Sequence, residues 1–374
     1  MRLSILFFFL LCSSYSIAQK YYLLIGTYNG KGSKGIYVYT FDAQTGKAKW
    51  VSNTDTITNP SYITLSHNGN FVYAVNETNG ADPGRVSAFS FNKIDGKLKF
   101  LNTVLSGGDD PCYIAANNSN KWVAVANYSS GSAAIFPVNK NGSLQTYSQL
   151  MQDSGSSINK QRQEKAHVHE TVFSPDYNYL FTPDLGMDKV MIYKFKSSLK
   201  KPLEPASPAF VNATPGSGPR HITFSPNGKF AYLIHEMGGT ITAYNYKNGK
   251  LNAIQELPTH PEGFKGTLGS AEVFVSPDGK YLYASNRGDE NTITIFSVNA
   301  STGKLKLIGY QPVFGKAPRN FIIDPSGNYL LVANQDSDNI VIFKRDKKTG
   351  LLKETKEQIK LPKPVCLQMI SLHH

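Results

Sequence analysis

Short apolar runs and turn-forming residues follow one another along the whole chain in a fixed order. In residues 218–246 the apolar run HITF is followed by the turn SPNGK, a second apolar run FAYLIHE, and a third run, TITAYNY, in which apolar and polar residues alternate. Alternation with a period of two is typical of β-strands with one buried face, and Pro, Asn and Gly together favour a tight turn. A shorter, more polar run comes next, as expected of an outer edge strand, so each unit predicts four antiparallel strands.

The same order of runs recurs along the chain. The pairs that open the first predicted strand of each unit are Asn59-Pro60, Asp110-Pro111, Val168-His169, Gly218-Pro219, Gly269-Ser270, Ala317-Pro318 and Lys363-Pro364. The intervals between successive units are 51, 58, 50, 51, 48 and 46 residues, and the Ser/Asn/Gln-rich insertion at residues 150–166 accounts for the longest. Repetition at this spacing predicts units arranged radially or as a solenoid.

The last unit is incomplete, because a single strand-like run, VCLQMI, follows Pro364. The N-terminal part supplies the missing runs: YYLLIGTYNG reads as a second strand, GIYVYTFDAQTG as a third and AKWVSNTDT as a fourth. A sheet built from both ends of the chain closes a ring and removes two unpaired edges. We therefore expect an all-β protein: a seven-bladed β-propeller with four antiparallel strands per blade, occupying residues 19–374 as one domain. Residues 158–166 are the one segment that permits a helix.

In a propeller the first strand of each blade lines the central channel, and the loops at one end of the channel form a shared mouth. Residues just before the first strand and just after the second should therefore converge there from all blades. Before or in the first strand these are Tyr62, Tyr113, His167, His169, Arg220, His221, Glu272, Arg319, Asn320 and Gln368. After the second strand they are Tyr28, Asn76, Glu77, Asn127, Tyr128, Asp184, His235, Glu236, Asn286, Arg287, Asn334 and Gln335.

Arginines give this predicted mouth its character. Arg220, Arg287 and Arg319 occupy mouth positions in three consecutive blades. Guanidinium groups gathered at one mouth repel one another unless anions are present. Glu236 and Glu272 would supply those anions if the cluster is a set of salt bridges. We favour the alternative, recognition of a substrate carboxylate or phosphate, to which the bidentate fork of Arg is suited.

Other candidates each have a structural alternative. His221 is either a hydrogen-bonded strand histidine or part of the site, and Asn286 either binds substrate or caps its loop, as the equivalent asparagines do. His167 and His169 lie on one face of their strand, which would also suit a metal ion, but no third His or Cys is in register. We therefore expect no metal and no cofactor. A histidine beside the arginines would serve as a general acid or base near neutral pH.

Charge and cysteine content narrow the class of partner. The 374 residues carry a formal charge of +12, but the lysines are spread through turns and no nucleic-acid recognition motif is present, so we expect no nucleic-acid partner. Cys112 and Cys366 fall in predicted strands of different units. We expect two buried free thiols, the alternative being a disulfide. No run after the N-terminus reaches the roughly 18 apolar residues of a membrane span.

The first eighteen residues predict a signal peptide. Arg2 is followed by the apolar run ILFFFLLC and by small residues, Ser16 and Ala18, that suit cleavage near Ala18. We expect an exported protein, either periplasmic or secreted. A lipoprotein attached through Cys12 is the weaker alternative, because Leu11 stands where a small residue is wanted.

Several stretches together resemble the lactonase family of seven-bladed propellers, which contains the propeller-type 6-phosphogluconolactonases and the carboxy-muconate lactonizing enzymes. They are KAHVHETVFSPD, PDLGMDKVMIYKF, GPRHITFSPNGKFAYLIHE, SPDGKYLYASNRG and PRNFIIDPSGNYLLVANQDSDNI, and the resemblance covers residues 20–370. It implies hydrolysis or formation of a sugar-acid or carboxylate lactone, without a nucleotide cofactor. By motif, the family's site residues match Arg220, Glu236, Arg287 and either His167 or His169. His235 departs from the family, which commonly has Asn before this Glu.

For lactone hydrolysis we expect His169 or Glu236 to activate a water molecule as general base, with Arg220 stabilising the oxyanion. Arg287 and Arg319 would hold the phosphate or carboxylate of a small anionic substrate. The other candidates for substrate binding are His221, Glu272 and Asn286. No Ser lies in a Gly-x-Ser-x-Gly context, so a covalent acyl-enzyme is not expected.

Two other functions fit the same pattern. One is a non-catalytic exported propeller that binds a glycan or protein partner through the mouth. The other is a lactonizing isomerase acting on a muconate-type diacid, which would also use the arginines. In each case we expect a monomer.

Overall fold

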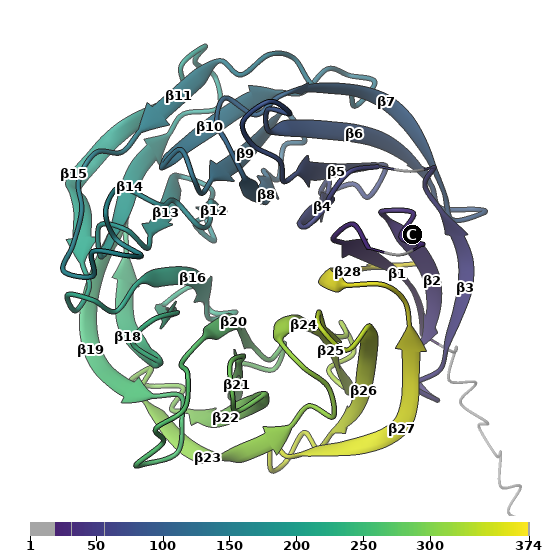
Figure 1. Cartoon of the computed structure of the whole chain (residues 1–374), viewed down its shortest axis with the longest axis vertical. Helices are drawn as coiled ribbons and strands as arrows, with labels where there is room; N and C mark the ends of the chain where they lie inside the picture. Colours follow the sequence, from purple (N-terminus) through teal and green to yellow (C-terminus); the bar gives the residue numbers. More distant parts are fainter. Residues whose placement is uncertain (1–18, 31, 56, 373–374) are drawn as a thin grey trace, which may run out of the picture.

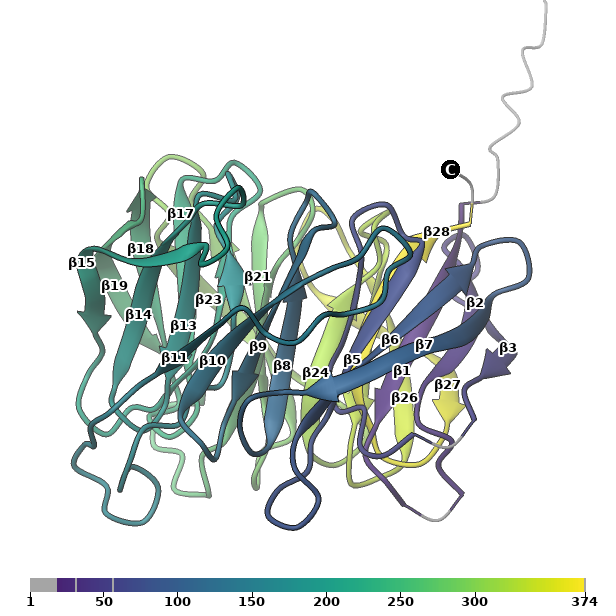
Figure 2. The same cartoon turned by 90° about the horizontal axis from the view of Figure 1, so that it is seen from above.

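The computed structural model describes residues 19–30, 32–55 and 57–372; the predicted signal peptide and its lipoprotein alternative lie outside these residues. The described residues form seven four-stranded antiparallel sheets, arranged as blades around a central axis (Figure 1). Seen from the side, the inner strands run steeply from one end of the ring to the other (Figure 2). The predicted seven-bladed β-propeller is confirmed. Residues 158–166, where a helix was permitted, form turns and bends.

We number the blades in chain order and give each from its inner to its outer strand. Blade 1 holds β4 (Ile63–Leu65), β5 (Phe71–Asn76), β6 (Arg85–Asn92) and β7 (Lys97–Leu105). Blade 2 holds β8 (Pro111–Ala116), β9 (Trp122–Asn127), β10 (Ser132–Pro137) and β11 (Gln149–Gln152). Blade 3 holds β12 (Val172–Phe173), β13 (Tyr179–Asp184), β14 (Lys189–Phe195) and β15 (Leu203–Asn212). Blade 4 holds β16 (Pro219–Phe224), β17 (Phe230–His235), β18 (Thr240–Lys247) and β19 (Lys250–Pro258).

The last three blades complete the ring. Blade 5 holds β20 (Ser270–Val275), β21 (Tyr281–Asn286), β22 (Thr292–Val298) and β23 (Leu305–Pro312). Blade 6 holds β24 (Pro318–Ile323), β25 (Tyr329–Asn334), β26 (Asn339–Arg345) and β27 (Leu352–Lys360). Blade 7 holds β28 (Pro364–Ser371), β1 (Lys20–Thr27), β2 (Tyr37–Asp42) and β3 (Ala48–Asn53).

Blade 7 joins the two ends of the chain, as predicted. β28 lies antiparallel to β1, with Tyr22 opposite Ile370 and Leu24 opposite Gln368. The C-terminal strand therefore becomes the inner strand of a sheet whose other strands come from the N-terminal part. This pairing confirms the predicted closure of the ring.

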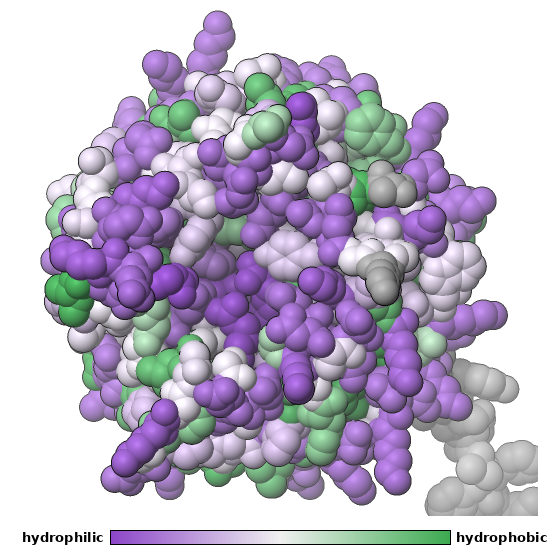
Figure 3. All heavy atoms as spheres, in the orientation of Figure 1, coloured by the Kyte–Doolittle hydropathy of each residue, from purple (hydrophilic) through white to green (hydrophobic). Residues whose placement is uncertain are grey.

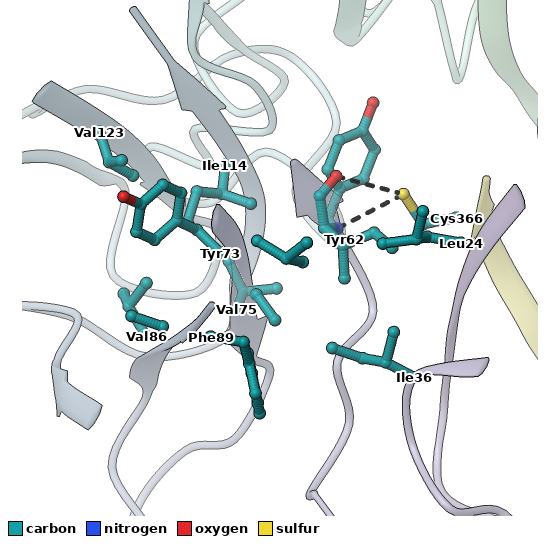
Figure 4. Packing of buried hydrophobic residues seen from close by; sticks show 14 of the residues in the cluster. Leu24, Ile36, Tyr62, Tyr73, Val75, Val86, Phe89, Ile114, Val123 and Cys366 are labelled. Atoms are coloured by element: carbon teal, nitrogen blue, oxygen red, sulfur yellow. Dashed lines mark hydrogen bonds between the residues drawn. The ribbon is translucent and has the colours of Figure 1, made fainter. Parts of the chain in front are cut away.

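The second strand of each blade is buried because neighbouring blades cover both of its faces. β9 (WVAVAN) and β25 (YLLVAN) are buried along their whole length, whereas the outer β19 is mostly exposed or half-buried. A strand covered on both faces needs an unbroken apolar run, which is what these sequences supply. Figure 4 shows such packing between blades, where Tyr73 and Val75 of β5 meet Ile114 and Val123 of blade 2.

The two described cysteines are buried and unpaired, so the prediction of free thiols is confirmed and the disulfide alternative is wrong. Cys366 lies on β28 beside β4, where its Sγ is 3.4 Å from the N–H of Ile63 and 3.7 Å from its carbonyl oxygen (Figure 4). Cys112 lies on β8 and donates to the carbonyl of His169 (3.3 Å).

The turns between first and second strands are held by their own side chains. In the turn from Ser225 to Gly228, Ser225 Oγ donates to Asn227 Oδ1 (2.7 Å) and accepts the N–H of Phe230 (3.0 Å), while Gly228 has a positive φ of 66°. These turns lie at the end of each blade opposite to the loops that enter the first strand and leave the second. They are scaffold, and the mouth is at the other end. None of the described residues belongs to a helix long and apolar enough to cross a membrane.

Candidate active site

The carboxylate of Glu236, directly after β17, is the centre of the candidate site. Its Oε1 accepts a hydrogen bond from Arg162 Nη2 (2.8 Å), and its Oε2 accepts one from Arg220 Nε (3.0 Å) and lies 2.9 Å from Arg287 Nη2. Burial by itself would raise the pKa of Glu236, but Arg287 and Arg220 hold it well below its usual range. Glu236 is therefore an anion that gathers arginines from three segments of the chain.

β-Bulges help to set where two of the predicted arginines lie. The pairing of β16 with β17 shifts register at Arg220, and the pairing of β24 with β25 shifts at Arg319, so each arginine is the extra residue of a bulge. Two residues earlier, Gly218 and Ala317 have positive φ values of 66° and 56°. Bulges re-aim side chains and are frequent beside active sites.

His169 lies inside this cluster. Its Nε2 is 4.0 Å from Glu236 Oε2, and its ring meets the ring of His221 edge-on with 5.1 Å between centroids. Burial, together with the charge of Arg220, lowers the pKa of His169 well below its usual value. The imidazole is therefore neutral near pH 7 and able to accept a proton.

His167 is engaged elsewhere. Its Nδ1 lies 3.1 Å from the carbonyl oxygen of Tyr128, and its Nε2 lies 3.1 Å from Glu164 Oε1. Its ring also stacks on Tyr128, with 4.6 Å between centroids. Of the two histidines that the sequence left open, it is His169 that lies beside Glu236 and Arg220.

His221 and Glu272 form a second buried group. His221 Nδ1 lies 2.9 Å from Glu272 Oε1, and Asn320 Nδ2 donates to Glu272 Oε2 (2.5 Å). Burial lowers the pKa of His221 to about 4, so it is neutral near pH 7 and donates its Nδ1–H to the carboxylate. Glu272 therefore binds a histidine and an amide. Of the two glutamates that the sequence offered as salt-bridge partners of the arginines, only Glu236 forms such pairs, with Arg220 and Arg287.

Among the three predicted mouth arginines, Arg319 is the one that does not contact Glu236. Its guanidinium carbon lies 5.4 Å from the ring centroid of Tyr28, whose hydroxyl donates to Glu77 (2.8 Å). Within the described residues its side chain makes no hydrogen bond or ion pair. Its donors are thus available to an incoming carboxylate or phosphate.

Sequence reasoning missed Arg162, which the insertion after β11 contributes. Besides Glu236 Oε1, its Nη2 reaches the hydroxyl of Tyr128 (3.2 Å). The Arg162 side chain is 47% exposed, so it covers the cluster from the solvent side. The 58-residue interval indicated an insertion. Residues of an insertion cannot be aligned with those of other blades, so the sequence could not place Arg162 at the mouth.

Glu170 was also missed, because it was read as the start of the apolar run ETVF. It is buried, and its Oε2 accepts the N–H of Ile222 of the next blade (2.6 Å). Burial raises the pKa of Glu170 well above its usual value, which favours the protonated form of this carboxyl group. Its position beside the His167–His169 motif was the one signal that sequence offered.

Asn286 is fully buried and bonded at both ends of its amide. Its Nδ2 donates to the carbonyl of Thr259 (2.8 Å) and its Oδ1 accepts from Ser270 Oγ (2.8 Å), which favours the loop-capping alternative over substrate binding. Ser270 Oγ also lies 3.3 Å from His260 Nε2, and His260 pairs with Glu290. Ser270, His260 and Glu290 thus lie in hydrogen-bonded sequence, as in a catalytic triad. Because Ser270 is fully buried and donates to Asn286, its hydroxyl is not presented to a substrate as a nucleophile.

Hydrophilic side chains gather around the centre of the ring on the face shown in Figure 3. Inside, Arg220, His221, Glu272 and Arg319 line one cavity of about 10 Å³, room for about one water molecule. The cluster is therefore almost filled at this depth, and a substrate would bind above it. In the part of the chain that the structure describes, no group of three or more His, Cys, Asp or Glu side chains is placed to hold a metal ion.

Comparison with known proteins gives matches along nearly the whole chain. The family described as lactonase, 7-bladed beta-propeller, matches residues 22–369. A 6-phosphogluconolactonase of Formosa agariphila is 39% identical over 354 residues, which cover 94% of this chain and all of that protein.

Solved structures agree. A putative 6-phosphogluconolactonase of Bacteroides fragilis superposes with a TM-score of 0.90 at 42% identity, covering 94% of this chain and 98% of that one. The periplasmic gluconolactonase PpgL of Pseudomonas aeruginosa gives a TM-score of 0.90 at 37% identity, covering 94% and 99%.

Proposed function

The chain belongs to the lactonase family of seven-bladed β-propellers, and from that premise we propose that it hydrolyses the lactone of a sugar acid, adding water to give the open-chain aldonic acid. It is thus a carboxylic-ester hydrolase of the 6-phosphogluconolactonase kind. The observation that carries this proposal is the buried cluster in which Glu236 joins Arg220 and Arg287, with His169 at 4.0 Å.

His169 is the general base. A neutral imidazole can take a proton from the water that attacks the lactone carbonyl, and the anionic Glu236 at 4.0 Å stabilises the imidazolium that results. When the tetrahedral intermediate collapses, the ring oxygen leaves and the same imidazolium returns its proton to it. Both Glu236 oxygens are already engaged by arginines, since Oε1 accepts from Arg162 and Oε2 accepts from Arg220 and pairs with Arg287. Its role is therefore to orient the arginines and support His169.

Arg220 stabilises the oxyanion of the tetrahedral intermediate. Its Nε and Nη1 are held by Glu236 (3.0 Å) and by the carbonyl of Ala271 (2.7 Å), which fixes the guanidinium before substrate arrives. A preorganised donor of this kind contributes roughly 3 kcal/mol to transition-state stabilisation in other acyl-transfer sites. No reorganisation is then needed during the reaction.

Arg319 anchors the anionic part of the substrate. Arg220 and Arg287 each contact Glu236, whereas the Arg319 guanidinium makes no ion pair within contact distance among the described residues, although the charges of Glu77 and Glu236 act on it. An uncommitted guanidinium suits a phosphate or carboxylate, so both a 6-phosphorylated and an unphosphorylated sugar lactone are to be assayed. Arg287 supports the site through its ion pair with Glu236, which helps to hold that carboxylate in place.

We further propose that the protein is exported and acts as a monomer outside the cytoplasm. The support for export is the charged, apolar and small-residue order of residues 1–18. A periplasmic relative with the same fold is compatible with this address.

The test is turnover of δ-gluconolactone and of 6-phosphogluconolactone by the purified protein and by Arg220→Ala. We expect kcat to fall by 10²–10³-fold, as for loss of one oxyanion donor elsewhere. The control is Glu204→Gln, which breaks an exposed pair with Lys196 (2.8 Å) at β15, the outer strand of blade 3. Turnover that Arg220→Ala leaves unchanged, or no turnover of any lactone by the parent protein, would refute the proposal. In the second case, turnover of a muconate would support the isomerase alternative.

A further inference from the structure

Two buried carboxyl groups face each other between blades 2 and 3. Asp184 ends β13 and is fully buried, and Asp153 follows β11 and is 8% exposed. The two carboxyl groups are neighbours that interact with each other, yet neither Oδ2 receives a hydrogen bond from a donor among the described residues. Two ionised carboxylates in such contact, away from water, repel each other strongly. We call them the Asp153–Asp184 pair.

The other blades show what this position normally requires. Where Asp184 stands, four blades carry an asparagine whose Nδ2 donates to a carbonyl oxygen of the loop before the first strand. These hydrogen bonds are Asn76 to Thr58 (2.8 Å), Asn127 to Ser106 (3.3 Å), Asn286 to Thr259 (2.8 Å) and Asn334 to Val313 (3.3 Å). Blades 1, 2, 5 and 6 therefore place a donor here, whereas blade 4 has His235 and blade 7 has Thr27 at the end of the same strand.

Asp153 occupies the corresponding loop position in its own blade. Its N–H donates to the carbonyl of Gly131 (3.0 Å), as that of Ser106 donates to Gly84 (2.9 Å) and that of Thr259 to Gly239 (2.9 Å). In the blades with an asparagine, the backbone carbonyl of this loop residue accepts from the asparagine, so Asp184 places an unprotonated acceptor where those blades have a donor. A carboxyl group supplies a donor only when it carries a proton.

The pair lies between two segments of the candidate site. Asp184 Oδ1 accepts the N–H of His167 (2.9 Å) and that of Met187 (2.9 Å). Blade 3 has a first strand of only two residues, so this bond and one from the N–H of His169 to the carbonyl of Pro183 (2.9 Å) hold the histidine segment to β13. Asp153 belongs to the same insertion, residues 150–166, as Arg162.

We propose that Asp153 and Asp184 share one proton, and that this proton makes them positioning residues for His169 and Arg162. The proton comes from solvent and is held between the two carboxyl groups. It gives Asp184 a donor, as the asparagine does in blades 1, 2, 5 and 6, while leaving Oδ1 free to accept from the histidine segment. Loss of the proton would set two anions against each other and loosen both segments.

The surroundings of the pair agree with this assignment. Burial and the neighbouring Asp184 raise the pKa of Asp153 to about 7, and burial raises that of Asp184. From β14, the Tyr193 hydroxyl lies 3.4 Å from Asp153 Oδ1, and Lys189 is the nearby cation that favours ionisation. His167 faces the pair through its backbone N–H.

The sign of the pH effect follows from the raised pKa. The folded protein binds a proton that the unfolded chain, with an ordinary Asp pKa of 3.8, releases earlier. The contribution of this proton to the free energy of unfolding is complete below pH 3.8. It is lost as the pH rises towards the folded-state pKa of about 7. Asp184→Asn replaces the proton by an amide, so its unfolding temperature should not share this fall.

The first experiment measures thermal unfolding of the full protein between pH 4 and 8.5, with the infrared band of a protonated carboxyl group recorded alongside. We expect the Tm of the parent protein to fall relative to Asp184→Asn as pH rises. The band should be weaker in Asp184→Asn and in Asp153→Asn than in the parent, and what remains belongs to other buried carboxyl groups such as Glu170. Parallel Tm curves, or a band of equal intensity in the parent and both variants at pH 6, would overturn the proposal. These measurements need no substrate.

The reciprocal variant Asn127→Asp puts an aspartate at the same position of blade 2. Asn127 Nδ2 donates to the carbonyl of Ser106, so its replacement sets an acceptor against an acceptor. We expect a Tm that falls more steeply with pH than that of the parent. A Tm curve parallel to that of the parent would show that the acceptor argument is wrong.

The second experiment rests on the proposed function, since it reads lactone turnover. With uncatalysed hydrolysis subtracted, kcat of the parent should fall between pH 6 and 8.5, whereas that of Asp184→Asn should change less than twofold. Asp184→Leu, which has no oxygen for the N–H of His167, should lose at least tenfold at every pH. A pH profile of Asp184→Asn identical to that of the parent would remove the positioning role.

Discussion

The variant Glu236→Gln removes the negative charge at the centre of the candidate site but leaves the shape of the side chain almost unchanged. Gln keeps the size of Glu and one acceptor oxygen, but removes the anion that contacts Arg162, Arg220 and Arg287 at 2.8–3.0 Å. Three guanidinium groups are then left without that anion. We expect both the stability of the ring and the rate of lactone turnover to fall.

The magnitude follows from burial. At an effective dielectric constant of about 20, a contact near 3 Å is worth on the order of 5 kcal/mol before desolvation is counted. Arg162 is half exposed, and solvent screens its share. Removing one partner of a buried ion pair costs about 3–5 kcal/mol. With an unfolding entropy of roughly 2.1 cal/mol/K per residue, that loss lowers the Tm of a chain of this length by about 4–6 °C.

The pH dependence of this loss has a definite sign. The pKa of Glu236 is depressed in the folded protein, so its stabilisation is present above the ordinary value of 4.5 and is lost as the pH falls through the folded value. The Tm difference between parent and Glu236→Gln should be full at pH 6–8 and narrow only in acid. Glu204→Gln, an exposed control, should change Tm by about 1 °C or less at each pH.

Calorimetry over this pH range, with kcat measured at pH 7, tests the reasoning. We expect kcat of Glu236→Gln to fall at least 100-fold, because both the support of His169 and the orientation of Arg220 are lost. A variant with the parent's Tm would mean that solvent or the arginines' other contacts neutralise the cluster. A Tm difference that is equally large in acid would contradict an ionised, buried Glu236.

Three further outcomes are expected. His169→Gln should lower kcat at least 100-fold and His167→Gln less than tenfold, measured at pH 7; equal losses would mean that the engaged histidine also takes part in the chemistry. Arg319→Ala should raise KM for a phosphorylated lactone by at least tenfold with a smaller effect on an unphosphorylated one, and an equal rise for both would argue against an anion anchor. Burial raises the pKa of Cys366 to about 12 and that of Cys112 further, so neither thiol should react with a thiol reagent in the native protein, while both should after unfolding. Native-state labelling followed by mass spectrometry would decide this.

Much of the fold was predictable because the same pattern of strands and turns recurs in each blade. Each blade repeats the same order of strands and turns, so an ambiguous unit could be read from its neighbours, and the incomplete last unit implied closure with the N-terminal strands. The exception is blade 3. The run ETVF predicted a four-residue first strand, but only Val172–Phe173 pairs, because Asp184 and Pro183 hold the preceding histidine segment instead.

The site residues that could be predicted from the sequence were those that stand at repeat positions. Arg220, Arg287 and Glu236 stand at repeat positions, and the structure brings them together as expected. Arg162 stands in an insertion, where no register exists, and its contact with Glu236 crosses from another blade. Glu170 was read as core because a single polar residue inside an apolar run gives no sign of the hydrogen bond that it makes.

The pairing of β28 with β1 also bears on how the chain folds. It sets Tyr22 opposite Ile370, about 350 residues away, whereas every other blade is a local hairpin meander. Since the entropy of loop closure grows only with the logarithm of length, joining these ends costs about 1.7 kcal/mol more than closing a loop of about 50 residues. The penalty is small, but so distant a contact forms late. Until it does, β1 has an open edge, and a chain truncated before Pro364 would keep it as a template for aggregation.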